Sequence, residues 1–292
     1  MDARAILMLA LQSSIFLTVF SFGLQSTLAD LTFLIHRPGL LVRSLVAMFL
    51  IMPLYAVFVV SNYRGHPDVN IALIALALSP VPPLLPRRVQ TSGGLASYGI
   101  ALMVTASIFC IAFIPIALQV IGRAFNREVT MNPLAVVKVL AITILIPLGV
   151  GMLFKAFAPK AAERIAKPLG TIALALLLLG VVVVSVAIFP VAWGLVGDGT
   201  ILVLAAFVVI GLLVGHFLGR PDPDASVTLA LCTACRHPAL ALTIATATFP
   251  QEKEVVGAIF LYALLNVVLA IPYIRWQRKR AIHAPAVGKF AA

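Results

Sequence analysis

The chain has 292 residues, of which 62% are hydrophobic and 11% are charged, and its formal net charge is +11. A soluble domain carries about 25% charged residues, so this composition excludes a soluble protein and predicts a membrane protein made of helices. Nucleic-acid binding is not expected either. The basic residues lie in short loops and after the last apolar run, which is typical of loops beside membrane spans.

Hydropathy predicts about nine crossings, since about 20 apolar residues span the hydrocarbon core. The fold class is therefore expected to be an all-α polytopic membrane protein, with one transmembrane domain over residues 1–292 and a basic tail at 276–292. The first run is longer than the apolar core of a usual signal peptide, so it is expected to remain as a span. The predicted crossings lie at roughly 5–28, 39–60, 69–88, 95–120, 132–155, 168–190, 200–218, 225–249 and 255–275.

The distribution of Lys and Arg predicts the orientation. Arg275, Arg278, Lys279 and Arg280 follow the last apolar run, and the positive-inside rule places such a cluster in the cytoplasm. Nine crossings then put the N-terminus on the outer side of the cell membrane, which is either an inner or a plasma membrane. The basic loops agree with this orientation.

One apolar run contains charged and helix-breaking residues at its centre. Within Leu231–Ala241, which reads LCTACRHPALA, Arg236 and His237 are followed by Pro238. Proline removes a backbone donor, so a helix is expected to break here, and broken backbone at membrane depth requires protein or a polar cavity around it. A buried arginine in a span marks a functional site. Every acidic residue lies in a loop or at the end of a run, so Arg236 has no carboxylate at its depth and is expected to attract an anion.

A second break is predicted at the proline cluster SPVPPLLP, residues 79–86. Arg64, Pro67 and Asp68 precede this apolar run as Arg220, Pro221 and Asp222 precede the run containing Arg236. The two units lie five crossings apart, so they enter the membrane from opposite sides. Inverted repeats with interrupted helices indicate a transporter whose site is at the midplane. Two unrelated proline kinks are the alternative.

The candidate substrate-binding residues surround these two breaks: Arg236, His237, Cys232, Thr233, Pro82 and Pro86. A neutral His237 is expected beside the arginine. Cys232, Cys235 and His237 could be soft metal ligands, but the arginine between them would repel a cation, so neither a metal nor a cofactor is expected. No acid, base and nucleophile constellation suggests an enzyme. Arg87 and Arg88 mark either the cytoplasmic mouth or an ordinary basic loop.

At these residues the chain resembles the bile acid:sodium symporter family. The similar segments are SSIFLTVFSFGLQ near the start, AMFLIMP at 47–53, the interrupted third run, and LCTACRHPALALTIATATFP followed by GAIFLYALLN at 257–266. The resemblance implies a panel domain at about 5–28, 132–155 and 168–190, and a core domain at about 39–120 and 200–275. It also implies that the two broken helices cross each other.

The sodium-site positions that the resemblance implies lack the usual ligands. The family pattern Glu-x-x-x-Gln-Asn-Ser-Gly is replaced by Cys232, Arg236, His237, Pro238 and Ala239, and a family glutamine by Met48. Leu85 and Pro86 stand in place of Ser-Asn, and Gly99 and Met103 in place of hydroxyl residues. Sodium coupling is therefore not expected. The hypothesis is that Arg236 permanently supplies the charge that sodium supplies elsewhere.

The sequence thus favours a secondary active transporter or facilitator of a small organic anion that works by alternating access. Three alternatives remain: a sodium symporter whose ion site is made of backbone carbonyls, an efflux carrier of the auxin-carrier type, and a membrane sensor or partner subunit that does not transport. Because fold alone does not fix function, this interpretation rests partly on analogy. The sequence does not indicate an oligomeric state.

Overall fold

A computed structural model describes residues 3–125 and 131–283, and every regular element in those ranges is a helix. Prolines start many of the helices, because the first turn needs no N–H from that residue. The elements are α1 (Ala3–Gln25), α2 (Leu28–Thr32), α3 (Pro38–Leu45), the π-helix η1 (Val46–Ile51), α4 (Met52–Asn62), α5 (Pro67–Leu78), α6 (Leu85–Thr91), α7 (Ala96–Ala124), α8 (Pro133–Leu140), the π-helix η2 (Ala141–Leu145), α9 (Ile146–Phe157), α10 (Pro159–Gly194), α11 (Thr200–Leu218), α12 (Pro223–Ala234), α13 (Pro238–Thr248) and α14 (Val255–His283).

The described helices make this an α-helical, multi-pass membrane protein, as predicted. Seven helical segments are long and apolar enough to cross a membrane, and two shorter apolar helices, Leu9–Gln25 and Pro67–Leu78, accompany them. The longest helix, α10, has 36 residues and starts at Pro159, earlier than the predicted 168. Of the predicted basic tail, α14 carries the residues up to His283, and residues 284–292 lie outside the described part.

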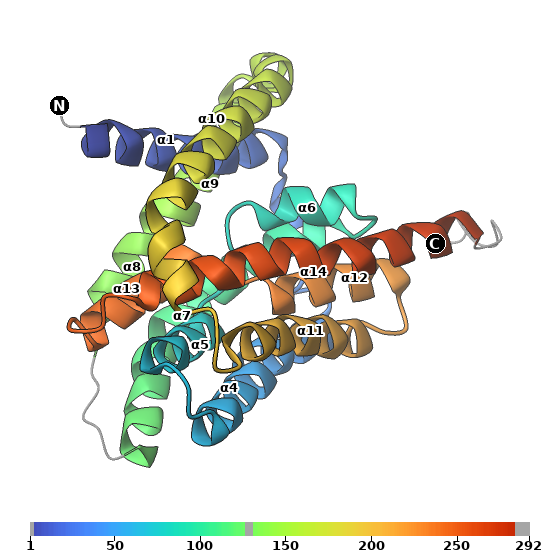
Figure 1. Cartoon of the computed structure of the whole chain (residues 1–292). Coiled ribbons are helices and arrows are strands. Elements are labelled where there is room, and N and C mark those ends of the chain that lie inside the picture. Colours follow the sequence, from blue (N-terminus) through green and yellow to red (C-terminus); the bar gives the residue numbers. More distant parts are fainter. Residues whose placement is uncertain (1–2, 126–130, 284–292) are drawn as a thin grey trace.

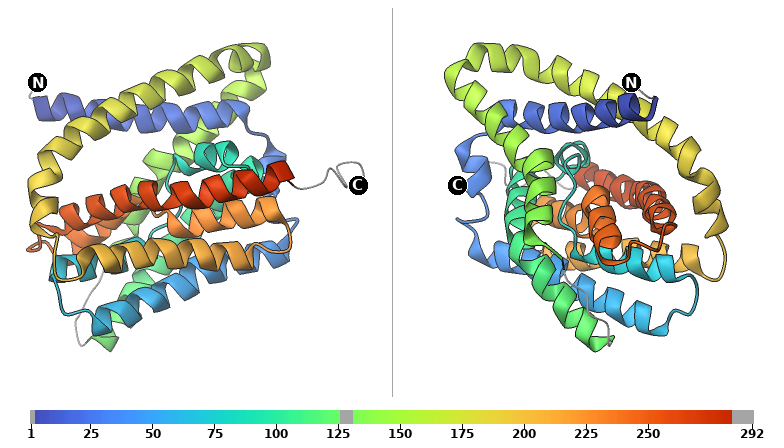
Figure 2. Two further views of the ribbon diagram at one scale, coloured as in Figure 1. Left: turned by 45° about the vertical axis from the view of Figure 1, so that its right-hand side comes forward. Right: turned by 90° about the vertical axis from the view of Figure 1, so that its left-hand side faces the viewer.

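The helices form two groups in space (Figure 1 and Figure 2). In one group α1 packs against α9 and α10, and in the other α11 packs against α12 and α14. The continuous chain of α8, η2 and α9 passes from one group to the other, as does α10 (Figure 2). The apolar core lies mainly in the second group, where α5, α7 and α12 are lined by completely buried side chains.

A row of glycines lets α12 approach α11 closely. Gly211, Gly215 and Gly219 recur every four residues, so they share one face of the chain. A Cβ atom added at Gly215 would lie 2.4 Å from the carbonyl oxygen of Leu229, which is backbone and cannot turn aside. Small residues permit such close packing of membrane helices. The position of α12, and of the break at its end, therefore depends on this row.

Gly215→Ala is expected to destabilise the protein, because the added methyl group overlaps the backbone of α12. Overpacking of this kind costs about 1–3 kcal/mol, so the melting temperature in detergent should fall clearly. Gly149→Ala in α9 is the matched control, since a Cβ atom there meets nothing within 4 Å. Equal melting temperatures for the two variants would contradict the close approach of α11 and α12.

Candidate functional site

Two interrupted helices meet at the centre of the second group. One helix ends at Leu78 and resumes as α6 at Leu85. The other ends at Ala234, passes through Cys235 in extended conformation (φ −101°, ψ 117°), and resumes as α13 at Pro238. The two connections touch, because the backbone N–H of His237 donates to the carbonyl of Pro80 at 2.9 Å. We call this junction, formed by residues 79–84 and 235–237, the crossing.

The guanidinium group of Arg236 joins these connections to a third segment. The side chain has no exposed surface. Its Nη1 donates to the carbonyl of Ser79 at 3.1 Å, and its Nη2 donates to the carbonyl of Met48 at 3.0 Å. Within the part of the chain that the structure describes, no carboxylate lies within ion-pair distance of this group. The arginine is therefore a buried cation that backbone carbonyls compensate in part.

The free carbonyl of Met48 results from the local sequence. In an α-helix this oxygen would accept from the N–H of Met52, but in η1 that N–H donates to Ala47 instead. The next possible donor is residue 53, which is a proline and has no N–H. The π-helical turn and Pro53 together leave an acceptor for the guanidinium. Such π-turns are frequent at functional sites.

The end of α12 is held by side chains from α14. The carbonyl of Ala234 accepts from the Tyr262 hydroxyl at 2.6 Å and from the Asn266 amide at 2.9 Å. The same Tyr262 oxygen accepts from the backbone N–H of Arg236 at 2.7 Å. Arg88 of α6 donates to the Asn266 side-chain oxygen at 2.9 Å. Backbone groups that the break leaves without helical partners are thus satisfied.

Hydrogen bonds identify the form of His237. Its Nδ1 accepts from the N–H of Leu240 at 3.3 Å and so caps α13. Its Nε2 lies 3.4 Å from the hydroxyl of Thr143, whose own proton goes to the carbonyl of Val139 at 2.7 Å. Nε2 must therefore donate, and Nδ1 carries no proton. The imidazole is neutral in this arrangement, and it links the crossing to η2.

The other predicted positions are all buried. Cys232 and Thr233 lie inside α12, and the Thr233 hydroxyl has no described partner. Pro82 lies in the first break, Leu85 begins α6, and Pro86 faces Gly99 where α6 meets α7. Met103 is also buried in α7. Their roles as substrate or sodium-site positions remain predictions.

Three contributors were not anticipated from the sequence: Tyr262 and Asn266, which hold the first half of the second broken helix, and Thr143, which contacts His237. Tyr262 and Asn266 are four residues apart in GAIFLYALLN, and this spacing on one helix face was the available signal. Arg88 was assigned to a mouth or a loop, but it reaches inward to Asn266. Among the described residues no group of three metal-ligating side chains forms a cluster.

A polar pocket of about 240 Å³ lies between the two helix groups. It is lined by residues of α1, α2, α6 and α7, and Pro86 is one of them. Asp30 lies at its edge. Burial raises the pKa of this carboxyl, but hydrogen bonds from Ser97 and Thr27 outweigh that effect and hold the pKa below its usual value. The pocket residues are Phe22, Gln25, Ser26, Asp30, Pro86, Gln90, Ala96, Ser97 and Ile100.

Comparison with known proteins identifies the family. The sequence profile of the sodium bile acid symporter family matches residues 13–189, which is more than half of the chain. The chain belongs to this family. The matched region contains the first break and Met48, and it ends before Arg236. No curated protein matches the chain.

Tyr262→Phe is expected to destabilise the protein, because it removes the hydroxyl that serves both the Ala234 carbonyl and the Arg236 N–H. An unsatisfied buried polar group costs about 1–3 kcal/mol. Thermal or denaturant unfolding in detergent measures this cost. Tyr55→Phe is the matched control, since no hydrogen bond of the Tyr55 hydroxyl is described in the structure. A Tyr262→Phe protein as stable as the control would refute the assigned network.

Proposed function

We propose that this protein is a secondary active transporter or facilitator of a small organic anion, and that it works by alternating access without sodium. Membership of the sodium bile acid symporter family supports transport. The contact of the Arg236 guanidinium with the carbonyls of Ser79 and Met48 supports independence of sodium. We infer no enzymatic activity.

The guanidinium lies where a bound cation could fulfil the same role. Oxygen atoms from separate segments converge on it, as they do around a metal ion, but here the charge is covalently attached. The arginine replaces the family's glutamine at a sodium-site position, and Met48 occupies another such position. A fixed charge that organises the crossing leaves no reason for an ion to bind. This is the step on which the proposal of sodium independence rests.

The symporter with a carbonyl-built sodium site is the weaker alternative. Its ligands would have to include free carbonyls at the crossing, and two of these already accept from Arg236. A sodium ion beside the guanidinium would also face like-charge repulsion in a region of low dielectric constant. An efflux carrier differs only in direction of flux. A sensor that does not transport has no specific observation in its favour.

The positive charge favours an anionic substrate. No described carboxylate pairs with Arg236, so its charge adds a positive potential at the centre of the protein. The substrate would enter the pocket that Pro86 lines. The negative charge of Asp30 at that pocket is opposed by Lys155, which helps to lower the pKa of this carboxyl and donates to the carbonyls of Gln25 and Ser26 at 3.0 Å each. Because Arg236 itself is completely buried, we propose that it acts on the substrate by its field in this conformation. Direct contact would follow a movement of the crossing.

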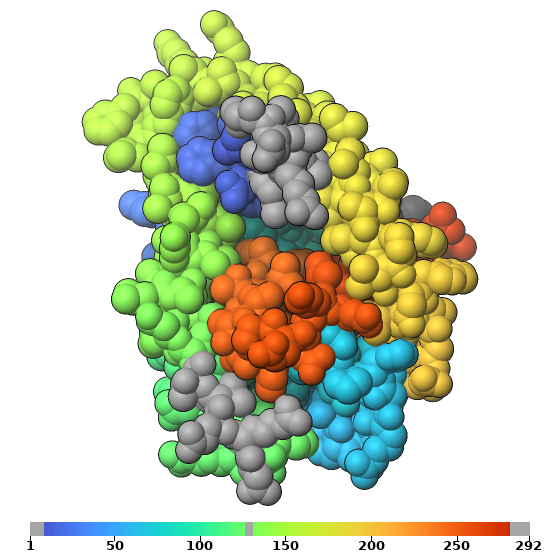
Figure 3. Space-filling model, turned by 60° about the vertical axis from the view of Figure 1, so that its left-hand side comes forward, coloured from blue at the N-terminus to red at the C-terminus, as the bar shows by residue number. Residues whose placement is uncertain are grey.

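Alternating access would arise from movement between the two helix groups. We assign α1, α8, η2, α9 and α10 to a panel domain and the remaining long helices to a core domain, with nine crossings and a cytoplasmic C-terminus in the cell membrane. The units α5–α6 and α12–α13 would be the inverted pair of broken helices. The surface is hollowed between α13 and the N-terminal part of α1 (Figure 3). The hydrogen bond between His237 and Thr143 joins core to panel and would break as they separate.

Uptake of labelled organic anions into proteoliposomes is expected to be equal with sodium or choline outside, because the cation at the crossing is part of the chain. Arg236→Gln is expected to abolish uptake, since it removes the charge and leaves the carbonyls of Ser79 and Met48 without their donors. Retained uptake by Arg236→Gln would count against the role of this arginine. Uptake by the wild-type protein that requires sodium would refute the proposal itself.

A double variant provides the control for a folding defect in Arg236→Gln. Cys232→Glu combined with Arg236→Gln restores two residues of the family's sodium-coupled pattern. If the arginine substitutes for the ion, this variant should fold and transport better in sodium than in choline. A double variant that is active but indifferent to sodium would show that the crossing is not the site where charge matters.

A further inference from the structure

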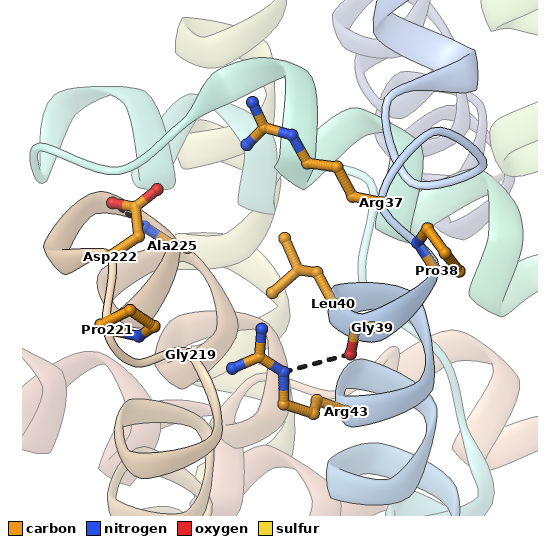
Figure 4. Close-up of a pocket in the computed structure, with 9 residues that line it drawn as sticks. All are labelled: Arg37, Pro38, Gly39, Leu40, Arg43, Gly219, Pro221, Asp222 and Ala225. Atoms are coloured by element: carbon orange, nitrogen blue, oxygen red, sulfur yellow. Dashed lines mark hydrogen bonds between the residues drawn. The ribbon is translucent and has the colours of Figure 1, made fainter.

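A second pocket, separate from the crossing, opens at one end of the helix bundle (Figure 4). It has a volume of about 280 Å³ and lies between the start of α3 and the connection from α11 to α12. Its polar side chains are those of Arg37, Arg43 and Asp222, which come from two separate parts of the chain and surround the same opening (Figure 4). Whole drug-sized ligands need pockets of about 300–1,000 Å³. The pocket therefore suits a small polar group.

The pocket lies at the end of three candidate membrane spans. The segment Pro38–Asn62 begins here, Thr200–Leu218 ends here, and Pro223–Thr248 begins here. Aromatic side chains mark the same level. Phe217 is 57% exposed and lies under the guanidinium of Arg220 at 4.9 Å, and Trp276 packs on His216 with ring centroids 5.5 Å apart. Of these two aromatic residues, tryptophan is the type that is enriched at the depth of the lipid headgroups.

The two arginines leave donors facing the pocket. Arg37 is exposed, and its described contact is with the face of Phe33 at 4.3 Å. Arg43 uses Nε on the carbonyl of Gly39 at 3.1 Å and Nη1 on the carbonyl of Arg220. Arg37 and Arg43 lie on two sides of the pocket (Figure 4), and guanidinium groups placed in this way are suited to bind a phosphate group that enters between them.

Asp222 makes a simple anion a poor occupant. One of its oxygens caps α12 by accepting from the N–H groups of Asp224 at 2.9 Å and Ala225 at 3.3 Å. Within the described residues no ion pair joins this carboxylate to either arginine of the pocket. A phosphate bound by Arg37 and Arg43 would be repelled by Asp222 unless a positive group accompanied it. A primary ammonium close to the phosphate would satisfy the carboxylate.

We propose that this pocket binds a phosphoethanolamine group, with the phosphate on Arg37 and Arg43 and the ammonium on Asp222. Because the pocket lies at the ends of candidate membrane spans, the headgroup of a phospholipid is the indicated source of this group. Free phosphoethanolamine is the soluble source with the same chemistry. The site is independent of the crossing and of its substrate.

The test measures the melting temperature of the purified chain in three kinds of nanodisc. The first contains a mixture of phosphatidylethanolamine and phosphatidylcholine, the second a mixture of phosphatidylglycerol and phosphatidylcholine, and the third phosphatidylcholine alone. The first mixture is expected to give the highest melting temperature, because among the three headgroups only ethanolamine carries a positively charged hydrogen-bond donor for Asp222. Asp222→Asn keeps the cap of α12, since asparagine is as good a cap as aspartate, and it should remove the advantage of phosphatidylethanolamine. Arg37→Gln should weaken binding by up to about fivefold.

Arg64→Gln is the matched control, since Arg64 is exposed at the other end of α4 and should not change the lipid preference. Equal melting temperatures in all three mixtures, together with no stabilisation by free phosphoethanolamine, would overturn the proposal, and so would a preference that survives Asp222→Asn. A higher melting temperature with phosphatidylglycerol than with phosphatidylethanolamine would also overturn it, because a simple anion would then be the ligand. Stabilisation by free phosphoethanolamine, but by none of the lipids, would support the chemistry and place its source in solution.

Discussion

The guanidinium of Arg236, with its donors on the carbonyls of Ser79 and Met48, is the interaction on which the rest of the structure depends. Two broken helices in a membrane protein expose backbone carbonyls that lipid cannot solvate, and a buried arginine has donors that need acceptors. The guanidinium supplies donors to the carbonyls, and the carbonyls supply acceptors to the guanidinium. Removing the arginine would leave the carbonyls without donors, and straightening the helices would leave the charge without compensation.

The surrounding structure positions this contact. The glycine row of α11 allows α12 to lie close, Tyr262 and Asn266 hold the carbonyl end of α12, and the π-turn before Pro53 frees the Met48 carbonyl. His237 caps α13 and reaches Thr143. These contacts involve six helical segments, α11, α12, α13, α14, η1 and η2, so the crossing is a junction of the whole bundle. A conformational change that separates the helix groups would have to rearrange it.

Much of the fold can be predicted from the sequence, because composition and hydropathy directly indicate which segments span a membrane. The break at Pro238 and the burial of Arg236 also follow from local chemistry, since proline cannot continue the hydrogen bonds of a helix. The partners of Arg236 do not follow. A free carbonyl at Met48 depends on a change from α- to π-helical hydrogen bonding, and no single residue of the sequence predicts this change. Likewise the sequence around Arg88 resembles a basic loop, and only the packing of α6 against α7 and α12 brings this side chain within reach of Asn266 on α14.

The most direct test of a built-in cation is whether sodium binds at all. Ligands that bind only the folded state stabilise it, by about 2.7 kcal/mol at a concentration of 100 times Kd. The melting temperature of the purified protein is therefore measured in sodium chloride and in choline chloride of equal ionic strength. A cation built into the chain predicts the same melting temperature in both salts across the titration. A stabilisation specific to sodium that saturates with concentration would contradict it, because an ion would then bind beside the fixed charge.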